Sequence, residues 1–166
     1  MRIIFIIITD NFSDMIQNIA LVAHDARKTE LVDWVKFNAR SLENCNLYCT
    51  GTTGRLIREA LVEVLGEENI PSVTCLLSGP LGGDAQIGAM IGEGKVDMLV
   101  FFCDNLIMQG HQNDVMSLVR LASLYNIPFA TNRSTADFII SSPLYTSTEY
   151  RKIIPACIES YKNRKL

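Results

Sequence analysis

A carboxylate beside a glycine-rich turn is the feature of this chain best suited to chemistry. The turn, SGPLGGD at residues 78–84, follows an apolar run typical of a buried strand and precedes apolar residues at helical spacing. A strand, a turn and an opening helix aim backbone N–H groups at an anion, which glycines let the backbone approach closely. Ser78 and Gly79 begin this cradle and Asp84 ends it. A carboxylate would oppose phosphate binding, which suggests that the site does chemistry and does not only bind an anion; capping the next helix is the simpler role for Asp84 taken alone.

A second turn of the same kind follows the strand-like residues 47–50. Thr50 ends that strand, and Gly51, Thr52 and Thr53 turn the chain into a helical pattern that begins near residue 55. Threonine hydroxyls and N–H groups at a helix start form a second cradle suited to phosphate. Neither turn matches the longer glycine patterns of nucleotide-binding loops. Two such turns at the ends of successive strands predict a ligand site there, because ligands bind beyond the carboxyl ends of strands in open α/β sheets.

The strand-like residues 19–23 lead into a short polar segment that contains His24, Asp25 and Lys28. His24 and Lys28 are four residues apart, so they share one face if a helical turn begins here. Lys28 can donate to a phosphate oxygen, and the ring of His24 can donate as well. Taken alone, the basic pair Arg27 and Lys28 is better explained as part of a solvated face. This segment is a third candidate for the same edge of the sheet.

The most apolar strand, residues 98–103, leads into a polar loop that contains the only other histidine of the chain, His111. A neutral imidazole at a strand end can polarise a carbonyl group and move protons near neutral pH. Asp104 and Asp114 flank the loop, and we expect them to be supporting residues that hold loop N–H groups or orient a histidine. Asp114 is also a plausible cap for the helix that follows.

Composition excludes several classes of protein. The chain has 166 residues, 48% hydrophobic content and a net charge of −3, which predict a compact α/β domain that does not bind nucleic acid nonspecifically. The five cysteines lack zinc-ligand spacing, so no metal is expected, and two of them lie in apolar strand runs, as buried, reduced thiols of a cytoplasmic protein do. The apolar run at residues 3–8 is too short to cross a membrane.

Strand-like and helix-like segments alternate along the chain, which predicts a three-layer αβα fold with a central, mostly parallel sheet and helices on both faces. We expect residues 18–166 to form this single domain. Leu31, Trp34, Val35 and Leu42 mark the inner face of one helix. The residues before this domain, 1–17, are expected to form an N-terminal extension with an extra strand that pairs with a sheet edge or another subunit.

The ordered set of these motifs resembles the methylglyoxal synthase family from residue 19 to about residue 143. The matching segments are residues 19–25 with Lys28, 50–54, 78–84, 94–97, 101–102, 126–128, 130–132 and 135–140. The resemblance implies a lyase that eliminates phosphate from dihydroxyacetone phosphate to give methylglyoxal, with no metal or organic cofactor. It also implies a homohexamer that inorganic phosphate inhibits allosterically.

The resemblance also implies roles for individual residues. Asp84 would be the catalytic base, His24 and His111 would contact the substrate, and Arg164 would serve communication between subunits. The residues at phosphate-holding positions are Lys28, Thr50, Gly51, Thr52, Thr53, Ser78 and Gly79. The chain departs from the family pattern at Asn105 and Gly110, where the family usually has proline, and we expect a less rigid loop that places His111 less well.

Two other functions remain open for such a chain. A non-catalytic effector-binding domain of the same fold, as in the large subunit of carbamoyl phosphate synthetase, needs an anion cradle but not Asp84 with two histidines. A cyclohydrolase of purine synthesis shares the fold, but its other features are not found in this sequence.

Overall fold

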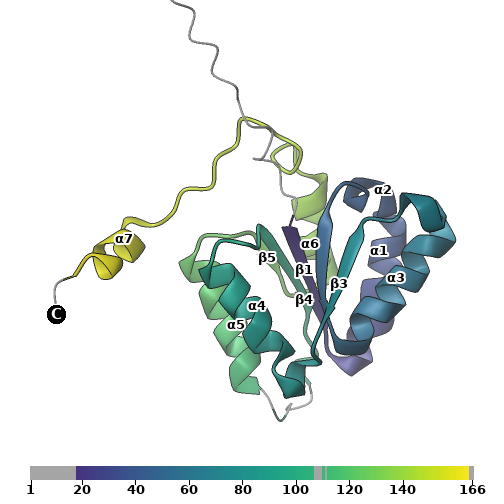
Figure 1. Cartoon of the computed structure of the whole chain (residues 1–166), viewed down its shortest axis with the longest axis horizontal. Coiled ribbons are helices and arrows are strands. Elements are labelled where there is room, and N and C mark those ends of the chain that lie inside the picture. The colour runs from purple at the N-terminus through teal and green to yellow at the C-terminus, as the bar shows by residue number, and fades with distance from the viewer. Residues whose placement is uncertain (1–17, 107–109, 111, 165–166) are drawn as a thin grey trace, which may run out of the picture.

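The computed structural model describes residues 18–106, 110 and 112–164. Its centre is a five-stranded sheet in which all strands pair in parallel, in the order β3-β2-β1-β4-β5. The strands are β1 (Asn18–Ala23), β2 (Asn46–Thr50), β3 (Ser72–Leu76), β4 (Met98–Phe102) and β5 (Phe129–Ala130) (Figure 1). After β1, the strands β2 and β3 are added on one side of it, and β4 and β5 are then added on the other side. Open parallel sheets bind ligands where the strand order changes side in this way, here between β1 and β4.

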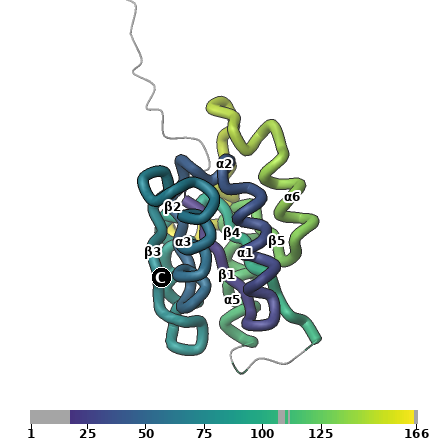
Figure 2. The backbone as a smooth tube through the Cα atoms, turned by 90° about the vertical axis from the view of Figure 1, so that its right-hand side faces the viewer, coloured from purple at the N-terminus to yellow at the C-terminus, as the bar shows by residue number. Residues whose placement is uncertain are grey.

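Helices cover both faces of the sheet, which confirms the predicted three-layer α/β fold. One face carries α1 (Lys28–Phe37), α2 (Ala39–Leu42), α3 (Gly51–Leu65) and α6 (Arg133–Ser141). The other carries α4 (Gly83–Gly92) and α5 (Gln112–Leu124). Figure 1 shows the two helical layers on either side of the strands, and Figure 2 shows α1 and α6 in front of the sheet. Short turns of 3₁₀ helix, η1 (Asp25–Arg27), η2 (Glu67–Asn69) and η3 (Gly79–Leu81), lie in the connections, and α7 (Ala156–Lys162) is near the C-terminus.

Two hydrophobic cores lie on opposite faces of the sheet because side chains alternate along each strand. In β1, Ile19 and Leu21 pack under α1 and α3, whereas Ala20 and Val22 pack under α4 and α5. All residues of β4 are buried, as a central parallel strand requires. Trp34 is fully buried in the first core, and its Nε1 donates to Asp137 Oδ1 at 2.9 Å.

The strand predicted at residues 73–77 exists as β3, but the prediction that it is buried is wrong. It pairs only with β2 and therefore forms an edge of the sheet, and each of its residues is either exposed or half-buried. Cys75 is accordingly exposed, whereas its neighbour across the strand pair, Cys49, is buried. An apolar run alone does not distinguish a central strand from an edge strand, because strand order is a property of the tertiary fold.

Several predicted element boundaries also differ. The single helix expected to include Leu42 is two helices, since α1 ends before Asn38, whose side chain donates to the Trp34 carbonyl at 2.9 Å. Gly51 is the first residue of α3, so residues 51–54 form its first turn and do not precede the helix. The extra strand predicted within residues 1–17 lies outside the described residues. No helix in the described part of the chain is both long and apolar enough to span a membrane.

Two buried thiols, those of Cys103 and Cys49, make the stability of the folded protein depend on pH. Burial raises the pKa of the Cys103 thiol from 9.0 to about 11, and burial also raises the pKa of the Cys49 thiol. The folded state therefore holds these protons more tightly than the unfolded state, so the stability they contribute is fully present below pH 9 and is lost as pH rises towards 11. We expect the Tm, followed by circular dichroism, to fall over this range, and to fall less in a Cys103→Ala variant. Equal alkaline slopes for the two proteins would contradict this prediction.

Candidate active site

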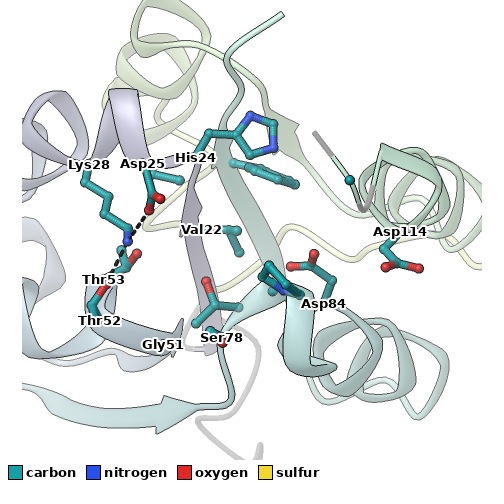
Figure 3. A pocket seen from close by; sticks show the side chains of 16 residues that line it. Val22, His24, Asp25, Lys28, Gly51, Thr52, Thr53, Ser78, Asp84 and Asp114 are labelled. Atoms are coloured by element: carbon teal, nitrogen blue, oxygen red, sulfur yellow. Dashed lines mark hydrogen bonds and ion pairs between the residues drawn. The ribbon is translucent and has the colours of Figure 1, made fainter. Parts of the chain in front are cut away.

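A cavity of about 440 Å³ opens at the carboxyl edge of the sheet, beyond the ends of β1 and β4 (Figure 3). Segments that are far apart in the sequence meet there, because parallel strands bring their carboxyl ends to one edge. Most of the predicted site residues line the cavity: His24, Asp25, Lys28, Thr50, Gly51, Thr52, Thr53, Ser78, Gly79, Asp84 and Asp114.

The two cradles pack directly against each other. Gly51 adopts a φ of +46°, which turns the chain from β2 into α3, and its N–H donates to the Leu77 carbonyl at 3.0 Å. A Cβ atom on Gly51 would lie 2.9 Å from the Cα of Ser78, so only glycine allows this approach. The side chain of Thr50, the N-cap residue, makes no cap hydrogen bond within the described structure. The N–H groups that follow Gly51 in the first turn of α3 can therefore bind an anion in the cavity.

Lys28 supplies a cation to this part of the cavity. Its Nζ lies 2.5 Å from Asp25 Oδ1 and donates to Thr52 Oγ1 at 2.7 Å (Figure 3). The lysine thus joins the segment after β1 to the first turn of α3. A phosphate bound at that helix start would contact the ammonium group, the threonine hydroxyls and the helix dipole together.

Asp84 owes its position to the two glycines before it. Gly82 is the N-cap of α4 with a φ of +105°, and Gly83 packs so tightly that an added Cβ would lie 1.9 Å from the Leu77 carbonyl oxygen. The Gly83 N–H donates to the Ser78 carbonyl at 2.9 Å. Asp84 follows in the first turn of α4 and is only 2% exposed. It is therefore a buried carboxylate on the cavity wall. The alternative prediction that Asp84 caps this helix is wrong, because the N-cap of α4 is Gly82.

His24 joins the end of β1 to the loop after β4. Its Nδ1 accepts a hydrogen bond of 2.8 Å from the backbone N–H of Asp104, and its ring packs edge-on against Phe101 with centroids 5.1 Å apart. A ring nitrogen that accepts a hydrogen bond carries no proton, so the neutral ring holds its proton on Nε2. The Asp104 side chain accepts from the Leu106 N–H at 3.0 Å and does not line the cavity in the described structure.

The remaining predicted residues are placed as follows. His111 lies outside the described residues, although its neighbour Gly110 lines the cavity. Asp114 lines the cavity from the first turn of α5, which begins at Gln112, so Asp114 does not occupy the N-cap predicted for it. Arg164 is not a lining residue, and its guanidinium carbon lies 3.7 Å from the ring centroid of Tyr161.

Some lining residues were not predicted from the sequence, notably Val22, Pro80 and Phe101. Phe101 could have been found from the period of two along β4, which places it near the strand end on the face of α4 and α5. Among residues 18–106, 110 and 112–164, no three His, Cys, Asp or Glu side chains are grouped so as to hold a metal ion. The cavity therefore combines a buried carboxylate, a lysine and a histidine with two helix starts, which suits proton transfer next to a bound anion.

Comparisons with known proteins agree with this chemistry. Residues 30–131 match the family model of the MGS-like domain. The chain is 53% identical over 139 residues to a methylglyoxal synthase of Leptospira interrogans, covering 84% of this chain and 88% of that protein. It is 48% identical to a methylglyoxal synthase of Maridesulfovibrio salexigens, covering 91% and 98%. The crystal structure of methylglyoxal synthase from Elizabethkingia anophelis matches with a TM-score of 0.77 and 43% identity, covering 90% and 92%. The chain is therefore an enzyme of the methylglyoxal synthase family.

Proposed function

We propose that this enzyme eliminates phosphate from dihydroxyacetone phosphate to give methylglyoxal and inorganic phosphate. The observation that carries the proposal is the buried carboxylate of Asp84, which lines the same cavity as the helix starts and Lys28. A site that only binds phosphate gains nothing from this carboxylate, since its charge opposes the anion. A site that must also take a proton from the substrate requires a base of this kind.

In the proposed mechanism one part of the cavity holds the phosphate group and another part moves a proton. The start of α3, Lys28 and the turn at Ser78 and Gly79 hold the phosphate group. Asp84 accepts a proton from C3, and the electron pair of the C–H bond moves towards the carbonyl oxygen to form an enediolate. The Nε2–H of His24, together with His111, stabilises the charge on that oxygen. The electron pair of the enediolate then forms a C1=C2 double bond as the C1–O bond breaks, and phosphate leaves with the bonding pair. The C3 hydroxyl gives its proton to the departing phosphate and becomes the aldehyde. The remaining enolate takes up a proton at C1, which balances the one that Asp84 removed, and gives methylglyoxal.

Replacing Lys28 by methionine tests the phosphate-holding part. The variant loses the ammonium group that lies against Asp25 and Thr52, while the aliphatic chain is kept. Because a hydrogen bond to a charged group contributes about 1.5–3 kcal/mol, we expect KM to rise about 10- to 150-fold. Steady-state kinetics measure this, with Lys36→Met as the control, because Lys36 pairs with Glu63 and is not part of the cavity lining. An unchanged KM in Lys28→Met would contradict the role of Lys28.

We further propose a homo-oligomer, expected to be a hexamer, that inorganic phosphate inhibits, with Arg164 serving communication between subunits. Exposed apolar side chains support the assembly: Phe138 is 80% exposed and Ile153 is 76% exposed. Phe138, Leu144 and Tyr150 also line a second cavity of about 290 Å³, which a second copy of the chain would cover. Light scattering during gel filtration measures the assembly, and the mass expected is that of six chains of 18.5 kDa.

A cytoplasmic location is proposed as well. All five cysteines are free thiols, including the exposed Cys75 and Cys157, as in proteins of a reducing compartment.

The experiment that tests the function is methylglyoxal formation from dihydroxyacetone phosphate by the purified protein, with inorganic phosphate titrated in. Methylglyoxal formation that inorganic phosphate suppresses would support the proposed synthase function. Saturable phosphate binding without any methylglyoxal would instead favour the non-catalytic effector-binding function and would point to the loop that contains Asn105 and Gly110.

A further inference from the structure

The peptide bond between Cys103 and Asp104 connects two side chains that come from the segment after β1. Its carbonyl oxygen accepts a hydrogen bond of 3.1 Å from Arg27 Nη1. Its N–H donates to His24 Nδ1 at 2.8 Å. One rigid peptide plane therefore has a guanidinium at one end and the imidazole of the cavity at the other.

Arg27 is itself held in place by a second contact. Its Nε and Nη2 both lie 2.6 Å from Glu30 Oε2, one turn further along the chain. The hydrogen bond to Glu30 raises the pKa of the guanidinium above its ordinary value, so Arg27 is positively charged at neutral pH. Arg27 does not line the cavity, and any effect on the reaction must pass through the groups that it touches.

We propose that Arg27 is a positioning residue for the reaction: through the Cys103–Asp104 peptide it holds His24 in the form with its proton on Nε2. A guanidinium on the carbonyl oxygen polarises the peptide and makes its N–H a stronger donor, since linked hydrogen bonds reinforce one another. The Asp104 N–H can donate only to an unprotonated Nδ1, so the proton of the neutral ring lies on Nε2. His24 can then act only as a donor from Nε2 to the developing enediolate oxygen.

The same contact also fixes the start of the loop after β4. The Cys103 N–H donates to the Thr131 carbonyl at 3.3 Å, the His24 N–H donates to the Phe102 carbonyl at 3.2 Å, and Arg27 then holds the Cys103 carbonyl. Gly110, later in this loop, has no Cβ and therefore restricts the backbone less than other residues do. Anchoring the loop at its first peptide therefore stabilises the part of the loop that touches His24.

The test compares Arg27→Met, Arg27→Lys and Arg40→Met with the parent protein. Methionine removes the charge and the donors but keeps the bulk, whereas lysine can still donate to the Cys103 carbonyl. Arg40→Met is the matched control, because Arg40 pairs with Glu43 at the same spacing of three residues and does not line the cavity.

Nitrogen NMR of protein labelled at histidine reports the tautomer directly, and the chain has only two histidines, so His24→Gln assigns the signals. We expect the Nε2–H form alone in the parent, in Arg40→Met and in Arg27→Lys, and a mixture of tautomers in Arg27→Met. We also expect kcat of Arg27→Met to fall about tenfold with KM within twofold, as for the loss of a hydrogen bond to a charged group, and Arg27→Lys to recover most of the loss.

An unchanged tautomer in Arg27→Met overturns the proposal, whether or not kcat falls, because a fall alone would show a purely structural effect. If Arg27→Met does not fold, Arg27→Leu, which also removes the donor to the Cys103 carbonyl, must show the same mixture of tautomers. The kinetic part of the inference rests on the proposed function. The NMR result does not need turnover, so a parent protein without activity would refute the function and leave the tautomer result to decide the role of Arg27.

Discussion

An Asp84→Asn variant is expected to bind inorganic phosphate and to form methylglyoxal about 10²–10⁴-fold more slowly than the parent protein, the usual cost of losing an acid–base group. The amide matches the carboxylate in shape, so the packing of the first turn of α4 is kept. It cannot accept a proton from C3, and removal of its negative charge leaves phosphate binding equal or tighter. Coupled assay of methylglyoxal and calorimetric titration of phosphate measure the two effects separately.

The control for this variant is Asp33→Asn, which removes the same charge from an exposed position on α1. It should leave both activity and phosphate affinity at parental values. Turnover in Asp84→Asn close to that of the parent would remove Asp84 from the role of base. Loss of activity together with loss of phosphate binding would show that Asp84 shapes the cradle and does not act on the substrate.

Gly83→Ala is expected to destabilise the protein by about 3 kcal/mol or more, because overpacking against atoms that cannot move is costly. The new Cβ would lie 1.9 Å from the Leu77 carbonyl oxygen and 2.8 Å from its carbonyl carbon. These are backbone atoms of the residue directly after β3, so the turn must shift and carry Asp84 with it. For a chain of this size, the Tm should fall by about 6–12 °C.

Gly92→Ala is the matched control, since it makes the same substitution at the other end of α4. Its added Cβ would meet only the Tyr125 hydroxyl at an ordinary 3.8 Å. Relief of the entropy cost of a helical glycine should leave this variant as stable as the parent or up to about 1 kcal/mol more stable. Thermal denaturation of the three proteins checks the prediction, and a Gly83→Ala variant as stable as the parent would refute the close contact.

The sequence alone predicted most of the cavity wall. Strand-like runs that end in polar or glycine-rich segments mark His24, Lys28, Thr50, Ser78 and Asp84 as candidates. Because parallel strands present their carboxyl ends at one edge, these segments had to meet once the strands and helices alternated. The three-layer fold followed from the same alternation, and the family followed from the ordered motifs.

The tertiary structure decided what depends on strand order and on backbone contacts between distant segments. Only the placement of β3 at the edge made Cys75 exposed, although its run of apolar residues resembles a buried strand. The contact of Arg27 with the Cys103 carbonyl spans 76 residues and uses a backbone atom, as does the bond from Asp104 to His24. Every residue except proline has both backbone groups, so the sequence does not show which of them will form these hydrogen bonds. Only the pairing of β1 with β4 brings them together.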